Sequence, residues 1–269
     1  MLSEKAFAKI NLILTLRGKR DGLHLIDSVF YLTDLADHLT LEITDEDYNE
    51  VVYTDGRSYE KDTALITANL IKEKFSTSSV KVTISKNIPE GGGLGGSSAD
   101  AGAVARLMQR AFCLPTIQEE LLLKVGSDVP FCYRNLHARV RGIGEEVEAI
   151  TLPKLYVALV IPSSGVSTAQ SYAKYDQIGG DDGDVDEFLM KLRSRKKVTC
   201  VNALERASTK LNSDIAVGKE IVASVGFDGY GMTGSGSTLF GFCYQEDEFY
   251  KKLALIKEKV NGDFKIFYQ

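Results

Sequence analysis

Histidine and cysteine are both scarce in this sequence, and neither is spaced to bind a metal ion. The 269 residues include three histidines, His24, His38 and His137, which lie too far apart to form a zinc-binding pattern. The four cysteines contain no C-x-x-C pair. We therefore expect no metal held by the protein itself, and reduced thiols of the kind found in cytoplasmic proteins.

Long apolar runs and an excess of positive charge are missing as well. The longest apolar run near the start, "INLILTL" at residues 10–16, contains an asparagine and is too short to cross a membrane. Glu4 precedes it where a signal peptide would carry basic residues, so we expect no signal peptide. The formal net charge of −5 disfavours nucleic acid as the main partner. We expect a cytoplasmic protein that binds neither membrane nor nucleic acid.

Strand-like and helix-like patterns alternate irregularly along the chain. Residues 79–85, "SVKVTIS", alternate apolar and polar side chains as a half-buried strand does, and residues 63–75 have apolar side chains at helical spacing. "RDG" at 20–22 predicts a tight turn between two strands. A buried-type strand at 155–161 begins a second region. These patterns predict an α+β protein with two parts, residues 1–150 and 151–269.

Less regular stretches are interpreted more simply. Residues 26–47 are interpreted as several apolar, β-like segments, and residues 230–243 as a glycine turn that leads into one strand. The stretch after the strand at 155–161, up to residue 176, has no pattern that predicts a helix. No internal repeat or low-complexity tract is present.

The run "IPEGGGLGGSSADAG" at residues 88–102 contains six glycines, five of which precede two serines and an aspartate. A flexible loop or tight turn is the simplest interpretation. However, the predicted strand at 79–85 precedes the run, and helical periodicity follows it over residues 100–114. Strand, glycines and helix in this order are typical of a phosphate-binding site.

A dinucleotide-binding fingerprint is one alternative for this run. Gly91, Gly93 and Gly96 match G-x-G-x-x-G. That motif also needs an acidic residue at the end of a second strand about 20 residues further on. Glu119 and Glu120 lie near that distance, but inside a helical segment, so the context does not fit.

A Walker A loop is the other alternative, with Gly91 and Gly96 followed by Ser97 and Ser98. Ser97 occupies the place of the phosphate-binding lysine, which is the most diagnostic residue of that motif. The remaining interpretation is a cradle of backbone N–H groups at a helix N-terminus, without a lysine of its own. A nucleoside triphosphate fits such a loop better than a dinucleotide does.

The same run resembles the P-x-x-x-G-L-x-x-S-[SA]-[SA] signature of the GHMP kinases, a superfamily of ATP-dependent small-molecule kinases. Further motifs of the superfamily follow in order along nearly the whole chain: "AKINL" (8–12), "GKRDGLH" (18–24), "GSDVPF" (126–131), "GIGEEV" (142–147), "GVST" (165–168), "NALE" (202–205) and "MTGSGSTLFG" (232–241). The ordered set is most similar to the branch that phosphorylates the 2-hydroxyl of 4-diphosphocytidyl-2-C-methyl-D-erythritol in the non-mevalonate route to isoprenoid precursors.

This resemblance implies a fold and a set of ligands. The N-terminal half would resemble domain 2 of ribosomal protein S5, and the C-terminal half would be ferredoxin-like. ATP and the small-molecule substrate would bind in the cleft between them, with Mg²⁺ carried by ATP. The resemblance fits a monomer or a weak homodimer.

Two residues are predicted to be catalytic. In the sequence alone, Asp128 in "GSDVPF" is either a helix cap or a functional carboxylate. Lys9 stands in an apolar strand, where it either extends to solvent at an edge or needs a partner. The resemblance makes Asp128 the base that accepts the proton of the substrate hydroxyl. It makes Lys9 the partner of Asp128, stabilising charge on the reacting oxygens.

The resemblance also assigns binding residues. The nucleotide would contact Lys86 and the glycine run, namely Pro89, Glu90, Gly91, Gly92, Gly93, Leu94, Gly95, Gly96, Ser97, Ser98 and Ala99. The substrate would contact Asn11, Leu23, His24, Thr168, Tyr172, Gly234, Ser235 and Gly236. His24 would read the edge of the cytosine ring.

Three positions depart from the family pattern. The family tends to place an asparagine near the adenine where this chain has Ala64, and a glycine in the loop where it has Ser97. An aromatic residue usually stands where this chain has Leu23, and an aliphatic side chain is a weaker platform for a base. Tyr172 or Tyr175 would then carry more of the stacking.

The departure at Leu23 keeps open a kinase for homoserine or a mevalonate-like alcohol. A nucleotide-binding regulatory protein without catalysis is a further alternative, which Lys9 and Asp128 disfavour, and an NAD-dependent oxidoreductase is another.

Overall fold

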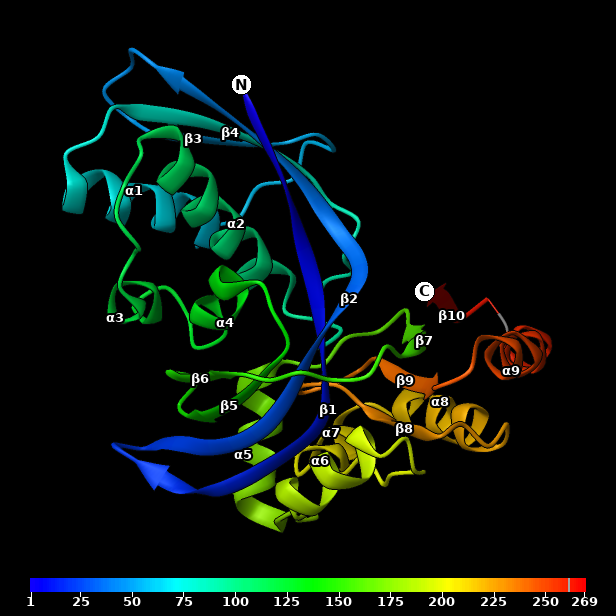
Figure 1. The fold of residues 1–269 in the computed structure, drawn as a ribbon. Helices are drawn as coiled ribbons and strands as arrows, with labels where there is room; N and C mark the ends of the chain where they lie inside the picture. Colours follow the sequence, from blue (N-terminus) through cyan, green and yellow to red (C-terminus); the bar gives the residue numbers. More distant parts are fainter. Residues whose placement is uncertain (261) are drawn as a thin grey trace.

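Two β-sheets organise the chain, and the computed structural model describes them over residues 1–260 and 262–269 (Figure 1). The strands of the first sheet are β1 (Leu2–Arg20), β2 (Leu23–Thr44), β3 (Glu50–Tyr53), β4 (Ser79–Ser85), β5 (Ala138–Gly142) and β6 (Glu146–Ala149). Those of the second sheet are β7 (Tyr156–Pro162), β8 (Gly229–Met232), β9 (Leu239–Cys243) and β10 (Phe264–Tyr268). The helices are α1 (Thr63–Phe75), α2 (Gly96–Ala111), α3 (Glu119–Leu123), α4 (Val129–Arg134), α5 (Thr168–Ile178), α6 (Val185–Arg193), α7 (Glu205–Leu211), α8 (Asp214–Ala223) and α9 (Glu246–Lys259).

A long hairpin of β1 and β2 runs through both parts of the molecule (Figure 1). The predicted turn at its tip is confirmed: Asp21 has φ of 52° and Gly22 of 81°. Positive φ at both central residues is the geometry of the type I′ turn that Asp-Gly favours. The pairing register shifts on both sides of the segment 9–11. Such bulges turn side chains away from the regular alternation, and they are frequent next to active sites.

The first sheet has the order β3-β4-β2-β5-β6, with β1 paired to β2, and only β3 and β4 run parallel. Helix α2 packs against β1 and β2 and is flanked by α1 and α4. It approaches α4 closely because it carries Gly102 on that side: a Cβ there would lie 2.6 Å from the carbonyl carbon of Cys132. This contact fixes the position of α4, and with it Asp128, the residue that precedes α4.

The second sheet is antiparallel, with the order β10-β7-β9-β8. Helices α5–α8 lie between β7 and β8 in the chain, and α9 lies between β9 and β10. This β-α-β-β-α-β arrangement is ferredoxin-like, so the α+β class is confirmed. The change of sheet falls between residues 149 and 156, where the division at residue 150 is predicted. That division stays a prediction, because one apolar cluster contains residues of both sheets.

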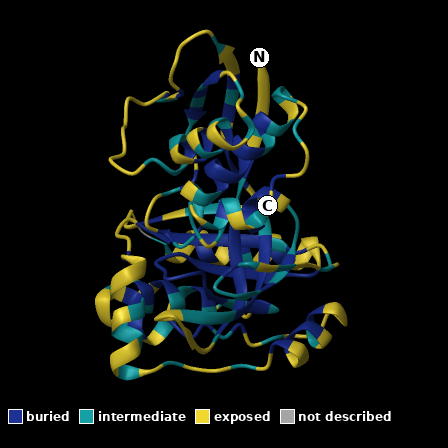
Figure 2. Ribbon diagram, turned by 90° about the vertical axis from the view of Figure 1, so that its left-hand side faces the viewer, coloured by how far each residue is buried: buried dark blue, intermediate teal, exposed yellow. Residues whose placement is uncertain are grey.

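Buried residues gather between the helices and the sheets, and the outer faces of the helices are exposed (Figure 2). Within the described part of the chain, no helix combines the length and apolarity that a membrane span requires.

Three features differ from the sequence-based expectations. Residues 23–44 form one strand, β2, instead of several segments. The glycine-rich stretch 229–232 forms β8, a second strand before the turn. Helix α5 has no predicted counterpart; Ser167 caps its start by accepting a hydrogen bond from the backbone N–H of Gln170.

Candidate active site

A cavity of about 1090 Å³ opens between the two parts of the molecule. Its walls come from β1 and β2, the glycine run, the turn before α4, helix α5 and the second glycine turn at 234–235. The predicted residues that line it are Lys9, Asn11, Leu23, His24, Lys86, Pro89, Glu90, Gly91, Gly92, Gly93, Leu94, Gly95, Gly96, Ser97, Ser98, Asp128, Thr168, Tyr172, Gly234 and Ser235. The cavity therefore brings most of the predicted site together, from segments far apart in the sequence.

Two predicted residues do not line this cavity. Ala99 is buried in the apolar cluster under α2. Gly236 faces the second sheet, where a Cβ would lie 2.8 Å from the sulfur of Met232. Their predicted contacts with ligands stay predictions.

The glycine run leads directly into α2. Gly95 occupies the N-cap position with φ of 72°, and no side chain caps the helix. The first backbone N–H groups of an α-helix have no intrahelical partner, and the positive end of the helix dipole lies at the same place. The start of α2 can therefore receive an anion through its backbone, as the sequence predicts for a lysine-free cradle.

The second glycine turn, at 234–235, is held against this cradle by two asparagines. Asn11 Oδ1 accepts a hydrogen bond of 2.9 Å from the backbone N–H of Gly234. Asn202 Nδ2 donates to the carbonyl oxygens of Met232 and Gly234. The sequence motif "NALE" marks Asn202, but this role was not predicted. Both amides fix the backbone on which Ser235 stands.

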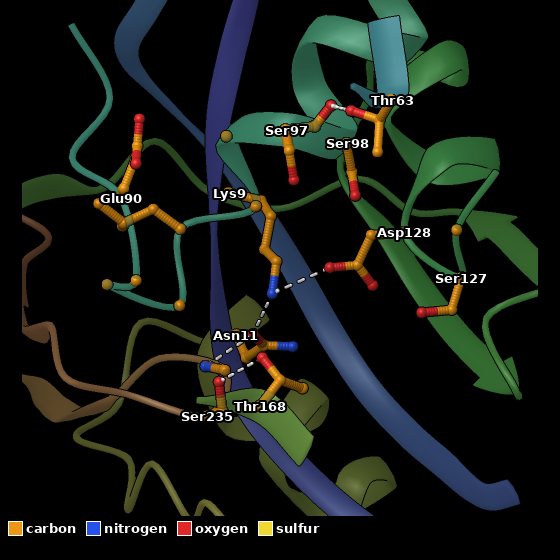
Figure 3. Close-up of a pocket in the computed structure, with 18 of the residues that line it drawn as sticks. Lys9, Asn11, Thr63, Glu90, Ser97, Ser98, Ser127, Asp128, Thr168 and Ser235 are labelled. Carbon is orange, nitrogen blue, oxygen red and sulfur yellow. Dashed lines mark hydrogen bonds and ion pairs between the residues drawn. The ribbon is translucent and has the colours of Figure 1, made fainter. Parts of the chain in front are cut away.

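Lys9 and Asp128 face one another directly beside the cradle (Figure 3). Lys9 Nζ lies 3.4 Å from Asp128 Oδ2 and donates a 2.7 Å hydrogen bond to Asn11 Oδ1. The lysine side chain is 5% exposed and its ammonium lies over the ring of Phe30. A Cβ on Gly95 would be 3.2 Å from Lys9 Cε and 3.8 Å from Asp128 Oδ2. The pair thus lies within contact distance of the loop that precedes α2.

Asp128 stands at the N-cap position of α4, but its side chain makes no capping hydrogen bond. Its carboxylate is 25% exposed and lines the cavity. Helix capping therefore does not account for this aspartate. One oxygen of the carboxylate faces Lys9. Because the side chain is partly exposed to the cavity, a ligand there can still reach the carboxylate.

A buried cluster of three charged residues lies behind the cradle: Lys86, Asp37 and Asp100. Lys86 Nζ is 2.5 Å from Asp37 Oδ2 and 2.6 Å from Asp100 Oδ2. Asp37 Oδ1 also accepts hydrogen bonds from the backbone N–H groups of Asn87 and Ile88. The two aspartates were not predicted. They hold the segment that leads into the glycine run against β2 and α2.

Burial dominates the electrostatics of this cluster. It raises the pKa of Asp100 to about 7, with the Asp37 carboxylate adding to the rise and Lys86 opposing it. Asp100 Oδ1 has no hydrogen-bond partner among the described residues. Burial alone would lower the pKa of Lys86, but the two carboxylates raise it above its ordinary value. Lys86 therefore stays charged, and its ammonium serves the protein as a structural link.

The far end of the cavity carries the residues predicted to bind the base. Leu23 is 56% exposed. The ring of His24 stacks on Tyr172 with 4.8 Å between centroids. Burial raises the pKa of Tyr172 to about 12, so that its hydroxyl stays neutral.

Thr168 Oγ1 lies 3.0 Å from Ser235 Oγ, and this contact joins α5 to the second glycine turn.

At the outer edge of the cavity, the side chain of Glu90 turns away from the lysine–aspartate pair (Figure 3). It forms an ion pair with Arg57 and accepts a hydrogen bond from Tyr59. Among the described residues, no group of three or more His, Cys, Asp or Glu side chains is arranged to hold a metal ion.

A backbone cradle facing a lysine–aspartate pair, between an α+β half and a ferredoxin-like half, defines a small-molecule kinase of the GHMP type. The family model "GHMP kinases N terminal domain" matches residues 62–135, which include the glycine run and Asp128. A crystal structure of homoserine kinase from Cytophaga hutchinsonii has the same fold, with a TM-score of 0.70, 17% identity, and coverage of 99% of this chain and 93% of that one.

More similar proteins narrow the class. The 4-diphosphocytidyl-2-C-methyl-D-erythritol kinase of Bacillus pumilus is 35% identical, with 91% of this chain and 89% of the relative covered. That of Desulfitobacterium hafniense is 32% identical, with 94% and 91% covered. A crystal structure of 4-(cytidine 5'-diphospho)-2C-methyl-D-erythritol kinase has a TM-score of 0.83 and 27% identity, covering 99% of this chain and 98% of that one. The chain belongs to this family of GHMP kinases.

Proposed function

We propose that this protein transfers the γ-phosphate of ATP to the 2-hydroxyl of 4-diphosphocytidyl-2-C-methyl-D-erythritol. The observation that carries the proposal is the Lys9–Asp128 pair, 3.4 Å apart and beside the glycine cradle. A kinase needs an anion site for the transferred phosphate and a base next to it, and the uncapped start of α2 and the Asp128 carboxylate support these two roles.

The cradle would bind the phosphates of ATP through the backbone. The uncapped start of α2 offers N–H groups and the positive end of the helix dipole. Ser97 and Ser98 add hydroxyl groups at the same place. The second glycine turn, with Gly234 and Ser235, would contact the reacting groups from the opposite side.

Asp128 would accept the proton of the substrate hydroxyl as that oxygen attacks the γ-phosphate. Its carboxylate is accessible from the cavity and has Lys9 as an ionic partner. Lys9 would hold the carboxylate in place and offset negative charge on the oxygens around the transferred group. Asn11 would hold Lys9 through its side-chain oxygen and keep the second glycine turn close.

Mg²⁺ would enter with ATP. This ion is usually bound by substrate phosphates and waters with few protein ligands, and the hydroxyl groups of Ser97 and Ser98 are suitable oxygen donors at the cradle. When bound, it neutralises charge on the phosphate oxygens. The protein residues would orient the acceptor and move its proton.

The cytidine end of the substrate would lie at His24, Tyr172 and Leu23. Because Leu23 offers no π-face, Tyr172 would supply the aromatic contact. The same position motivates the alternative of a smaller alcohol such as homoserine or mevalonate. A panel of these alcohols and the cytidyl substrate, each with ATP, separates the two by turnover.

Two further features complete the proposal. Three of the four free cysteines are buried and Cys113 is exposed, which fits a reducing compartment such as the cytoplasm. The cradle, Lys9 and Asp128 meet within a single chain, which is compatible with a monomer or a weak homodimer.

The test is an ADP-release assay with the cytidyl substrate. We expect Asp128→Asn to lower kcat by about 10²–10⁴-fold with little change in the KM for ATP. Asp45→Asn, an exposed aspartate after β2, is the control and keeps wild-type kcat. Near-wild-type ADP production by Asp128→Asn would rule out the mechanism.

A further inference from the structure

The imidazole of His24 is held by one face of α5. Its ring stacks on Tyr172 with 30° between the planes, and its Nε2 lies 2.8 Å from Asp176 Oδ1. Tyr172 and Asp176 are four residues apart and therefore lie on the same side of the helix. Tyr172 restrains the plane of the ring and Asp176 restrains its edge, so the orientation of His24 is fixed.

Asp176 takes its second hydrogen bond from Lys19, whose Nζ is 2.7 Å from Oδ2. Lys19 and His24 are directly paired across β1 and β2, so both reach the same carboxylate. Hydrogen bonds from Lys19 and His24 hold the pKa of Asp176 below its ordinary value. A carboxylate in the last turn of a helix opposes the helix dipole, and these two donors offset that cost.

The ionised carboxylate decides which nitrogen of His24 carries the hydrogen. An ionised aspartate can only accept hydrogen bonds, so Nε2 of His24 must be the donor. In the neutral ring, Nδ1 then carries a lone pair. In the part of the chain that the structure describes, no group donates to this Nδ1. Nδ1 of the neutral ring is therefore an acceptor, on a residue that lines the cavity.

We propose that Asp176 is a positioning residue that fixes His24 as the Nε2–H tautomer, so that the site selects an aminopyrimidine over an oxopyrimidine. The inference rests on the proposed function, because it takes the pyrimidine end of the substrate as the ligand of His24. Cytosine carries an amino donor at C4, whereas a uracil-type base carries an oxygen acceptor there. The C4 amino group donates a hydrogen bond to the lone pair of His24 Nδ1. A C4 oxygen instead brings its own lone pair against that of Nδ1, which is repulsive.

The first test compares the cytidyl substrate with its uridyl analogue in wild type and Asp176→Asn. An amide can offer His24 a donor, which stabilises the other tautomer. We expect wild type to prefer the cytidyl substrate in kcat/KM by about 10–100-fold, the range for one well-placed base contact. Asp176→Asn should lose about tenfold of that preference, mainly through KM, because the base lies away from the transferred phosphate.

Asp182→Asn is the matched control. Asp182 also ties the hairpin to the C-terminal half, through an ion pair of 2.9 Å with Arg17, and among the described residues it forms no hydrogen bond or ion pair with His24. Both aspartates are partly exposed, so neither change disturbs the core. The control should keep the wild-type ratio. An unchanged ratio in Asp176→Asn, or an equal change in both variants, overturns the inference.

The second test reads the tautomer itself, in the free protein. Long-range ¹H–¹⁵N spectra at alkaline pH distinguish the two nitrogens of each histidine, and His24→Gln assigns the signal. We expect Nε2–H in wild type and a larger Nδ1–H population in Asp176→Asn. Nδ1–H in wild type, or the same population in both proteins, overturns the inference.

The two proposals can fail separately. If wild type turns over neither pyrimidine substrate, the proposed function is wrong. Titration with CMP and UMP then decides the inference on its own: a preference for CMP that Asp176→Asn reduces supports it, and equal binding in wild type overturns it.

Discussion

A Cβ atom on Gly93 would lie 2.3 Å from the carbonyl oxygen of Thr233. The first glycine turn belongs to the N-terminal half and the second to the C-terminal half, and they touch here as bare backbone. Gly234 repeats the relationship from the other side, since a Cβ there would lie 2.8 Å from the carbonyl oxygen of Gly93. The glycines that form the cradle therefore also hold the two halves together.

Gly93→Ala should separate the two turns. The methyl group meets backbone that cannot move aside, and φ of 73° is unfavourable for alanine. We expect kcat/KM to fall at least about 100-fold, since small displacements at a reacting centre have effects of this size. Gly226→Ala is the control, with φ of 71° but open space around it. Equal activity of the two variants would show that the contact between the turns is dispensable.

Lys9→Met keeps an unbranched apolar side chain and removes the ammonium that lies over Phe30 and faces Asp128. If Lys9 acts through its pair with Asp128, we expect kcat to fall by about 100-fold or more. The double variant Lys9→Met/Asp128→Asn should be little worse than Asp128→Asn alone, because residues that act as a unit are not additive. Steady-state ADP release measures all three. Multiplicative losses would mean that the two residues act independently.

Asp100→Asn should change how stability depends on pH. The raised pKa of Asp100, about 7 against an ordinary 3.8, means that the folded chain keeps a proton that the unfolded chain has released. The contribution of Asp100 to the free energy of unfolding is fully present below pH 4 and is lost as the pH rises through 7. The variant removes that loss, so its stability relative to wild type should rise by roughly 2–3 kcal/mol between pH 5 and 8. Urea unfolding at the two pH values measures this, and a constant difference would contradict it.

Asp37→Ala should destabilise the protein strongly. It leaves buried Lys86 with one carboxylate and takes the acceptor from the backbone N–H groups of Asn87 and Ile88. Breaking a buried ion pair from one side costs about 3–5 kcal/mol. Asp34→Ala, on the exposed side of the same strand, should change the unfolding free energy by less than about 0.5 kcal/mol. A cost below about 1 kcal/mol for Asp37→Ala would mean that the cluster does not hold the segment before the glycine run.

Thiol labelling should distinguish Cys113 from the other cysteines. Burial raises the pKa of Cys132, Cys200 and Cys243, and all three side chains are inaccessible. Only a thiolate reacts quickly, so a chromogenic disulfide at pH 8 should label one thiol rapidly in the folded protein. All four should react in urea. Rapid loss of a second thiol from the folded protein would contradict the burial of Cys132, Cys200 or Cys243.

Residue patterns alone predicted the part of the site that depends on local order, whereas the resemblance to the GHMP kinases supplied residues from distant segments such as Lys9 and Asp128. Strand, glycines and helix follow one another along the chain, and the Asp21–Gly22 turn is likewise local. The Lys86 cluster is different, because Asp37 and Lys86 are 49 positions apart. They meet only because His38 pairs with Ser85 across β2 and β4. An aspartate in the apolar stretch "LADHL" is a signal for burial, but without that register it has no identifiable partner.

Two elements were missed because tertiary contacts outweigh local preference. Strand β8 contains Gly229 and Gly231, which weaken a strand pattern. Both are needed: a Cβ on Gly229 would lie 2.5 Å from the ring of Phe242, and one on Gly231 would lie 2.9 Å from the carbonyl oxygen of Cys200. Helix α5 buries only Ser171 fully, so its sequence has no apolar stripe at helical spacing.

The β1–β2 hairpin carries Lys9 in its middle and Leu23 and His24 beside its turn. Gly22 is held at a φ of 81° by the turn, but Leu23 beside it is largely exposed, so this position can vary without repacking the interior. The middle of the ribbon is fixed by the core on one side and the cradle on the other. If the proposed function holds, substitutions at the tip would alter which alcohol is recognised while Lys9 and Asp128 stay in place, and a new specificity would need the exchange of only a few residues at one turn.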